Sequence, residues 1–291
     1  MQKKHTGMIT ALACMALIGL AIYEISAFNT PAHTNQSIEL RIGSSKQVNV
    51  TYVTALYDIG REGRPFALYK EWIKETLKLP QAFIIYCRHE DLHWIIQARV
   101  GQDTVIILED SLPLEHTVND VQSIIQRVSQ GRTSPEWTNP RYIPLQFSKA
   151  VWLQRAIARN PFQSSTFFWI DAGLSRFFPQ TNMRYGLSAS DARLEPDRVY
   201  ITLAQSLADL AASPVQNIGM QRSFLAGGFF GGHSKPLARV CQALLDVYFR
   251  RMLARGRLDN EQVAFHLIYE QHNSWFRVLD KKAHGCGYMC M

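Results

Sequence analysis

The sequence has few cysteines, and their spacing does not suggest a cross-linked scaffold. Five cysteines are spread over 291 residues, which is too few and too dispersed for a disulfide-based fold. Cys286 and Cys290 lie near His284, but this spacing suits zinc poorly, and we interpret the segment as a C-terminal tail with room for one disulfide. With 47% hydrophobic and 19% charged residues, the chain can bury a sizeable core.

The sequence also lacks several common catalytic fingerprints. It contains neither the GxGxxG turn of dinucleotide-binding domains nor a P-loop, and no serine lies in a GxSxG context. His266 and His272 are six residues apart and so do not share a helix face as the histidines of a zinc protease do. These absences argue against four large enzyme classes.

The net charge of +7 is not concentrated in a nucleic-acid-binding pattern. The densest basic group is Arg250, Arg251, Arg255 and Arg257, and no zinc-finger or RNP motif accompanies it. We interpret this group as a solvated helix face and expect no nucleic-acid partner.

The N-terminus has the features of a signal-anchor. Lys3 and Lys4 precede an apolar run over residues 8–23. This run is longer than the apolar core of a typical signal peptide and shorter than a full membrane span. Positive charge before the run favours a cytoplasmic N-terminus. We therefore predict a cytoplasmic tip and transmembrane helix at 1–28, a polar stem at 29–47 and a catalytic domain at 48–291. A cleaved signal peptide is the alternative.

After the stem, strands and helices alternate, which predicts an α/β domain with a mixed, mainly parallel sheet flanked by helices. We expect strands at 48–57, 82–87, 94–100, 104–108, 166–170, 198–203 and 275–279. We expect helices at 66–77, 115–128, 147–159, 237–253 and 260–269, with Ser148 as the N-cap of the third. Residues 130–144 are expected to form a loop.

Asp171 is the sharpest chemical signal. The apolar strand at 166–170 runs directly into this carboxylate, and ligands of open α/β sheets bind beyond the carboxyl ends of the strands. An acid there could hold a Mg²⁺ or Mn²⁺ ion that bridges two phosphates. The residue pattern equally allows a helix N-cap at this position.

Three other segments allow both a functional and a structural interpretation. The glycine pairs in 225–232 permit close backbone approach to a ligand, but a tight hairpin or bulge would use them too. Asp259 and Glu261 lie at the start of an apolar helix, where a carboxylate could serve as a general base or bind sugar hydroxyls. Alternatively, Asp259 or Asn260 could simply cap the helix. Tyr57 and Arg61 could contact a base and a phosphate, or be structural.

The segments 54–61, 168–173, 226–232 and 259–262, in this order, resemble the HtrL/YibB family, glycosyltransferase-like proteins that include WlaTC-type bacterial members. The resemblance covers roughly residues 48–280 and implies a GT-A-like nucleotide-diphospho-sugar transferase fold. It implies that Asp171 stands in the place of the metal-binding D-x-D motif. Only one carboxylate is present there, so a metal would need a second ligand, for which His272 is the candidate.

The resemblance also implies roles for other positions. It places Thr54, Ala55, Tyr57 and Arg61 against the nucleotide and Lys149 near the donor phosphates. It places Gly227 and Gly228 beside the sugar, and Asp259 or Glu261 at the reacting centre.

The expected activity is transfer of a sugar, by a hexosyltransferase-like enzyme, from a nucleotide-sugar to a hydroxyl of a glycan, glycolipid or protein, assisted by Mn²⁺ or Mg²⁺. The alternative is a catalytically inactive, membrane-tethered protein that binds sugar or nucleotide. We expect a type II membrane protein with a catalytic domain in the Golgi or ER lumen if the source is eukaryotic, where the Asn35 and Asn49 sequons would mark a glycoprotein. In a bacterium we expect an envelope-associated enzyme.

Overall fold

The computed structural model describes residues 25–27, 38–43, 47–177, 194–204, 218 and 225–279. Of the cytoplasmic tip and transmembrane helix predicted at 1–28, only residues 25–27 are described, and they form a strand. The tail with Cys286 and Cys290 lies outside the described residues. None of the helices within the described ranges is both long and apolar enough to cross a membrane. Cys87 and Cys241 are buried free thiols.

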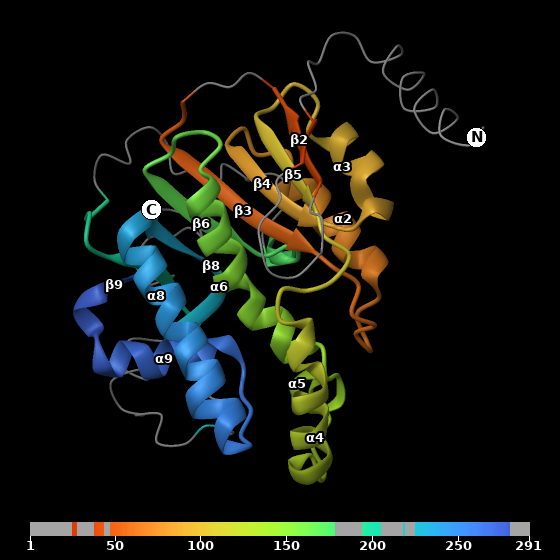
Figure 1. Ribbon diagram of the computed structural model, residues 1–291, viewed down its shortest axis with the longest axis vertical. Helices are drawn as coiled ribbons and strands as arrows, with labels where there is room; N and C mark the ends of the chain where they lie inside the picture. The colour runs from red at the N-terminus through yellow and green to blue at the C-terminus, as the bar shows by residue number, and fades with distance from the viewer. Residues whose placement is uncertain are drawn as a thin grey trace.

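A nine-stranded mixed sheet forms the middle of the molecule (Figure 1). Its strand order is β1-β2-β5-β4-β3-β6-β8-β7-β9. The strands are β1 (Ile25–Ala27), β2 (Ile38–Ile42), β3 (Val50–Leu56), β4 (Ala82–Cys87), β5 (Thr104–Leu108), β6 (Thr166–Ile170), β7 (Val199–Leu203), β8 (Leu225–His233) and β9 (Phe276–Leu279). The four central strands β5, β4, β3 and β6 are parallel, which confirms the expected mixed α/β fold.

Helices cover both faces of the sheet (Figure 1). One face carries α2 (Phe66–Thr76) and α3 (Leu92–Ala98), and the other carries α6 (Tyr142–Arg159), α8 (Ser234–Asp246) and α9 (Glu261–Gln271). The helices α4 (Val118–Val128) and α5 (Pro135–Thr138) lie beyond the end of the sheet, near the start of α6. Two hydrophobic clusters result, one on each face. The central strands are buried on both sides, which is why they are continuous apolar runs rather than alternating ones.

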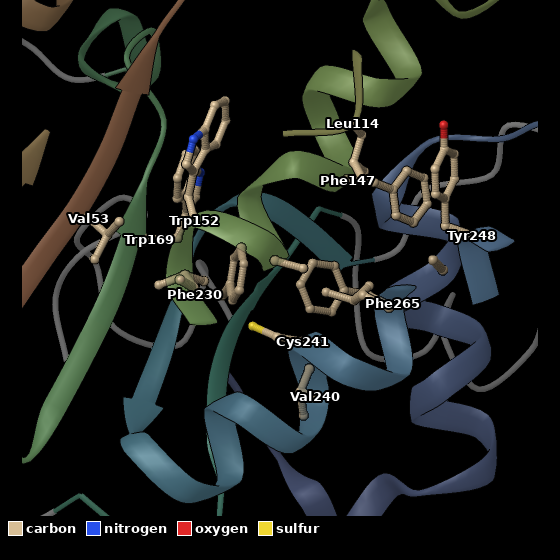
Figure 2. Close-up of a cluster of buried hydrophobic side chains, with 14 of the residues drawn as sticks. Val53, Leu114, Phe147, Trp152, Trp169, Phe230, Val240, Cys241, Tyr248 and Phe265 are labelled. Atoms are coloured by element: carbon tan, nitrogen blue, oxygen red, sulfur yellow. The ribbon is translucent and has the colours of Figure 1, made fainter. Parts of the chain in front are cut away.

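Figure 2 shows the larger cluster, where side chains of the sheet meet those of α6, α8 and α9. The rings of Trp152 on α6 and Trp169 on β6 stack with centroids 5.9 Å apart. Phe230 on β8 packs edge-to-face against Phe265 on α9, at 4.7 Å. These aromatic contacts fix α6 and α9 against the strands that carry the site.

The chain order creates a crevice between β3 and β6. From β3 the chain moves outward through β4 and β5, and it then returns to the other side of β3 as β6. Neighbouring parallel strands whose connections run in opposite directions leave a gap beyond their carboxyl ends, and ligands of open α/β sheets bind there. The ends of β3 and β6 are therefore the first place to look for a site.

Four sequence-based expectations need correction. Residues 94–100 belong mainly to helix α3, because Leu92, Ile95 and Ile96 follow helical spacing and face the core. The expected loop at 130–144 contains α5 and the start of α6. Ser148 is not an N-cap, since α6 begins at Tyr142 and the Ser148 hydroxyl donates to the Pro144 carbonyl. Residues 38–42, assigned to the stem, form β2 and pair with β5.

Candidate active site

A cleft opens at the carboxyl ends of β3 and β6, with an empty volume of about 950 Å³ that is partly open to solvent. Its walls come from the loop after β3, from α2 and α6, from the segment after β6 and from the start of α9. Six of the residues selected from the sequence line it: Ala55, Tyr57, Arg61, Lys149, Asp171 and Glu261. Elements more than 200 residues apart in the sequence therefore meet at one site.

Lys149 forms the centre of a charged cluster in this cleft. Its Nζ lies 2.9 Å from Asp171 Oδ1 and 2.7 Å from Glu261 Oε1, and it donates to the Gly227 carbonyl at 3.1 Å. Trp169 Nε1 also donates to Asp171 Oδ1, at 2.6 Å. The side chain of Asp171 is 38% exposed, whereas those of Lys149 and Glu261 are 9% and 3% exposed. Of the two carboxylates that pair with Lys149, Asp171 is thus the more open to a ligand.

The alternative role of Asp171 as a helix cap is wrong. Its carboxylate contacts the Trp169 indole NH and the Lys149 ammonium, whereas helix capping would require backbone amides of η3 (Leu174–Phe177). Its backbone NH donates to the Gly228 carbonyl at 2.9 Å.

The electrostatics of the cluster follow from its burial. Burial opposes charge on Lys149, but the carboxylates of Asp171 and Glu261 outweigh it and raise the pKa of the ammonium, which stays protonated. Burial raises the pKa of Glu261 above its usual range, although the ammonium of Lys149 acts in the opposite direction. Glu261 Oε2 is buried and has no hydrogen-bond partner among the described residues. Such an oxygen is suited to accept a hydrogen bond from a bound hydroxyl.

An irregularity in β8 positions this cluster. The register of β7 against β8 shifts between Ile201 and Thr202, so residues 227–229 have no counterpart on β7. Bulges of this kind re-aim backbone groups beside functional sites. Here the Gly227 carbonyl meets Lys149 and the Gly228 carbonyl meets Asp171. The glycine-rich segment therefore contains the bulge allowed by its sequence, within a strand of the sheet.

Two glycines of β8 differ in how much space surrounds them. A Cβ at Gly231 would overlap the Phe167 carbonyl and lie 2.5 Å from the Phe168 ring. At Gly228 the nearest atom would be Leu174 Cδ1, at 3.2 Å. We expect Gly231→Ala to lower the free energy of unfolding by about 3 kcal/mol because the neighbouring strand must move, and Gly228→Ala to lower it by less than about 1 kcal/mol. Urea unfolding of both variants measures this; equal losses would contradict the geometry.

Two of the expected nucleotide contacts are constrained by the fold. Thr54 is fully buried within β3 and does not line the cleft. Tyr57 lines it, but one face of its ring is stacked on Trp152 at 5.3 Å and its hydroxyl donates to the Glu109 carbonyl at 3.2 Å. Burial, together with the charge of Glu109, raises the pKa of this hydroxyl. Tyr57 is thus primarily a packed wall of the cleft.

Asp259 and His272 are placed away from the cleft. Asp259 is fully buried, and its carboxylate accepts from the Asn260 backbone NH at 2.9 Å. Asn260 caps α9 by accepting from Val263 N at 3.1 Å, so the capping interpretation holds for this segment apart from Glu261. His272 follows the far end of α9 and stacks on Trp275 at 4.0 Å.

The expected metal pair of Asp171 and His272 does not fit this arrangement. Glu261, which shares Lys149 with Asp171, is the first residue of the 11-residue helix α9, and His272 follows the last one. At 1.5 Å per residue, Glu261 and His272 are separated by about 16 Å along the helix. Within the described ranges, no group of three or more His, Cys, Asp or Glu side chains is placed to hold a metal ion. The position between the two carboxylates of the cleft is taken by Lys149 Nζ.

Several side chains that line the cleft were not selected from the sequence, among them Arg64, Tyr69, Tyr142 and Arg176. Arg64 comes three residues after Arg61, and Arg176 comes five after Asp171. The short sequence distance from each arginine to a residue already selected is a signal that could have identified it. The two tyrosines have no such signal, since their roles depend on how α2 and α6 pack.

Comparisons with known proteins give a family. No curated protein matches the chain. Among solved structures, it is similar to the glycosyltransferase GlyE of Streptococcus pneumoniae TIGR4, with a TM-score of 0.40 and 9% sequence identity, over 82% of this chain and 46% of that one. The chain thus spans under half the length of GlyE, and we draw no conclusion about activity from this similarity. The family of bacterial proteins of unknown function called HtrL_YibB matches residues 48–287, and the chain belongs to that family.

Proposed function

We propose that this protein is a glycosyltransferase that moves a sugar from a nucleotide-sugar donor to a hydroxyl of a glycan, glycolipid or protein. The observation that carries the proposal is the cluster of Asp171, Lys149 and Glu261 in the cleft beyond β3 and β6. Two carboxylates and several cationic side chains in one cleft suit a reaction in which a hydroxyl loses a proton and a diphosphate leaves.

The carboxylates would have different roles. Asp171, the more exposed of the two, is suited to bind hydroxyls of the donor sugar. Glu261 is suited to act as the general base, because burial raises its pKa toward neutral pH and one of its oxygens has no hydrogen-bond partner among the described residues. When the acceptor oxygen bonds to the anomeric carbon, its proton would pass to Glu261 and the bond to the diphosphate would break.

The proposed donor would lie with its diphosphate toward the arginines of the loop after β3. Arg61 donates to the Tyr69 hydroxyl at 2.7 Å and lies over the Tyr142 ring, 4.8 Å from its centroid. These contacts fix a guanidinium at the cleft wall, and a guanidinium matches the geometry of phosphate oxygens. In this proposal Lys149 would not bind the phosphates, contrary to what the resemblance implied, because its three donors are already used.

A panel of nucleotide-sugars tests this proposal. We expect the wild type to release nucleoside diphosphate from one donor class, and Asp171→Ala to lower the turnover by at least about 100-fold, because a lost hydrogen bond to the reacting sugar is felt most in the transition state. Liquid chromatography of the released nucleotide measures the rate. If the wild type binds a donor but never turns it over with any acceptor, the alternative of an inactive binding protein replaces the proposal.

A further inference from the structure

We infer that the cleft binds the donor diphosphate through Arg61, Arg64 and Arg176 without a divalent metal, and that Lys149 occupies the position between Asp171 and Glu261 where such a metal would otherwise bind. This inference depends on the proposed function for the identity of the donor. The presence of an anion-binding arginine cluster can be tested separately.

Lys149 fits this role because its hydrogen bonding is complete. An ammonium has three donors, and three acceptors lie within 3.1 Å of Lys149 Nζ: Asp171 Oδ1, Glu261 Oε1 and the Gly227 carbonyl. The ammonium therefore supplies the positive charge that a cation would bring to the two carboxylates. A divalent ion placed there would have to displace a buried charge with all of its partners, which is strongly unfavourable.

The three arginines come from two segments that meet at the cleft. Arg61 and Arg64 lie in the loop after β3, Arg176 lies in η3, and all three line the cleft. Neither Arg61 nor Arg64 forms an ion pair with a carboxylate among the described residues. Asp58 lies on the same loop, but its carboxylate accepts from the Gly60 backbone NH at 2.8 Å. The guanidinium groups of Arg61 and Arg64 are therefore suited to bind a phosphate-bearing ligand.

Aromatic rings hold two of these guanidinium groups. Arg61 lies over Tyr142, and Arg176 lies over Trp72 with its Cζ 5.3 Å from the ring centroid. Gly173 leaves room for Arg176, because a Cβ there would lie 2.6 Å from Arg176 Nη1. Burial and the neighbouring Arg64 and Arg61 lower the pKa of Arg176, although Tyr69 and Asp171 act in the opposite direction. Like charges thus lie close enough to repel one another, and a bound anion would relieve that repulsion.

The charges of the cleft suit a diphosphate. Asp171, Glu261 and Lys149 together carry a net charge of −1 when ionised, and the three arginines with Asp58, which lies on the same loop as Arg61 and Arg64, add a net +2. The negative part faces the sugar end in the proposed orientation, and the positive part faces the diphosphate. Negative charge that develops on the leaving group would be stabilised by the arginines, which is the role that a metal has in many phosphate-binding sites.

Calorimetric titration of the full chain with inorganic pyrophosphate tests the inference, in EDTA and in MnCl₂. We expect binding in EDTA, with an affinity within about threefold of that in MnCl₂. Arg64→Ala and Arg176→Ala should each weaken it by about tenfold or more, since a charge-assisted hydrogen bond contributes about 1.5–3 kcal/mol. Arg250→Ala is the matched control. Arg250 lies on η5 (Val247–Met252), its side chain is 81% exposed, and it pairs with Asp246 at the end of α8. It does not line the cleft.

Two results of the titration would overturn the inference. One is binding that requires Mn²⁺; the other is binding that survives loss of both Arg64 and Arg176. Electron paramagnetic resonance of Mn²⁺ gives a second measurement that needs no enzyme turnover. We expect no Mn²⁺ bound to the ligand-free protein through Asp171, and Mn²⁺ binding that disappears in Asp171→Asn would also overturn it.

The outcomes separate the two proposals. Pyrophosphate binding in EDTA without any sugar transfer would contradict the proposed function while leaving the anion site in place. Sugar transfer that is abolished by EDTA and restored by Mn²⁺ would support the function and contradict the metal-free site.

Discussion

Glu261→Gln is expected to lower kcat for sugar transfer by about 10²–10⁴-fold, the range over which a positioned general base acts. Glutamine keeps the volume and one hydrogen-bond acceptor for Lys149, so the cleft should keep its shape. The KM for the donor should change little, since Glu261 is proposed to act on the acceptor hydroxyl. Steady-state kinetics with donor and acceptor varied separately measure both constants.

The pH dependence gives an independent readout of Glu261. A base must be ionised to accept a proton, so the rate should fall as the pH drops through the pKa of Glu261. Because burial raises this pKa, the fall should lie above the ~4.3 of an ordinary glutamate, and it should vanish in Glu261→Gln. Glu270→Gln, near the other end of α9, is the matched control with unchanged kcat. A Glu261→Gln enzyme that retains most of its activity would contradict the assignment.

Lys149→Met is expected to lower the free energy of unfolding by about 3–5 kcal/mol at pH 7, the cost of leaving a buried charge without its partner. Methionine has nearly the same length but cannot neutralise Asp171 and Glu261. The double variant Lys149→Met with Glu261→Gln should recover part of the loss, because one uncompensated carboxylate is removed. Urea unfolding monitored by tryptophan fluorescence measures all three proteins.

The loss in Lys149→Met should depend on pH in a defined direction. In the wild type the Lys149 ammonium lowers the pKa of Glu261 and so opposes the effect of burial. Without the ammonium, this pKa rises further above its value in the unfolded chain. A carboxyl group with a raised pKa in the folded state favours folding at low pH, and this contribution is lost as the pH rises through that pKa. The deficit relative to wild type should therefore shrink between pH 7 and about pH 4.5.

A surface lysine provides the control for this experiment. Lys74 is 47% exposed and pairs with Glu71 on the outer face of α2. Exposed pairs of this kind contribute about 0.2–1 kcal/mol, so Lys74→Met should change stability little at any pH. If Lys149→Met were no less stable than Lys74→Met at pH 7, the buried cluster would not be the strong electrostatic contact that the distances indicate.

The sequence determined most of the sheet. β3, β4, β5, β6 and β7 were expected close to their observed bounds, because strands buried on both faces are short, continuous apolar runs with clear ends. It also placed Asp171 correctly after β6. The strand predicted at 94–100 was wrong, because this segment is apolar enough for either a strand or a helix. Its packing on the sheet as helix α3 determines its structure.

The tertiary structure alone decided the site. Lys149 and Glu261 are 112 residues apart, and they meet only because α6 and α9 pack on the same face of the sheet beside the bulge of β8. The same packing directs His272 and Asp259 away from the cleft. Arg176 reaches the cleft beside Arg61 and Arg64 because η3 packs against α2, where Arg176 lies over the Trp72 ring. Local patterns fix strands and helix caps, since those depend on neighbours in the chain. Contacts between distant side chains depend on how whole elements pack, which no single segment encodes.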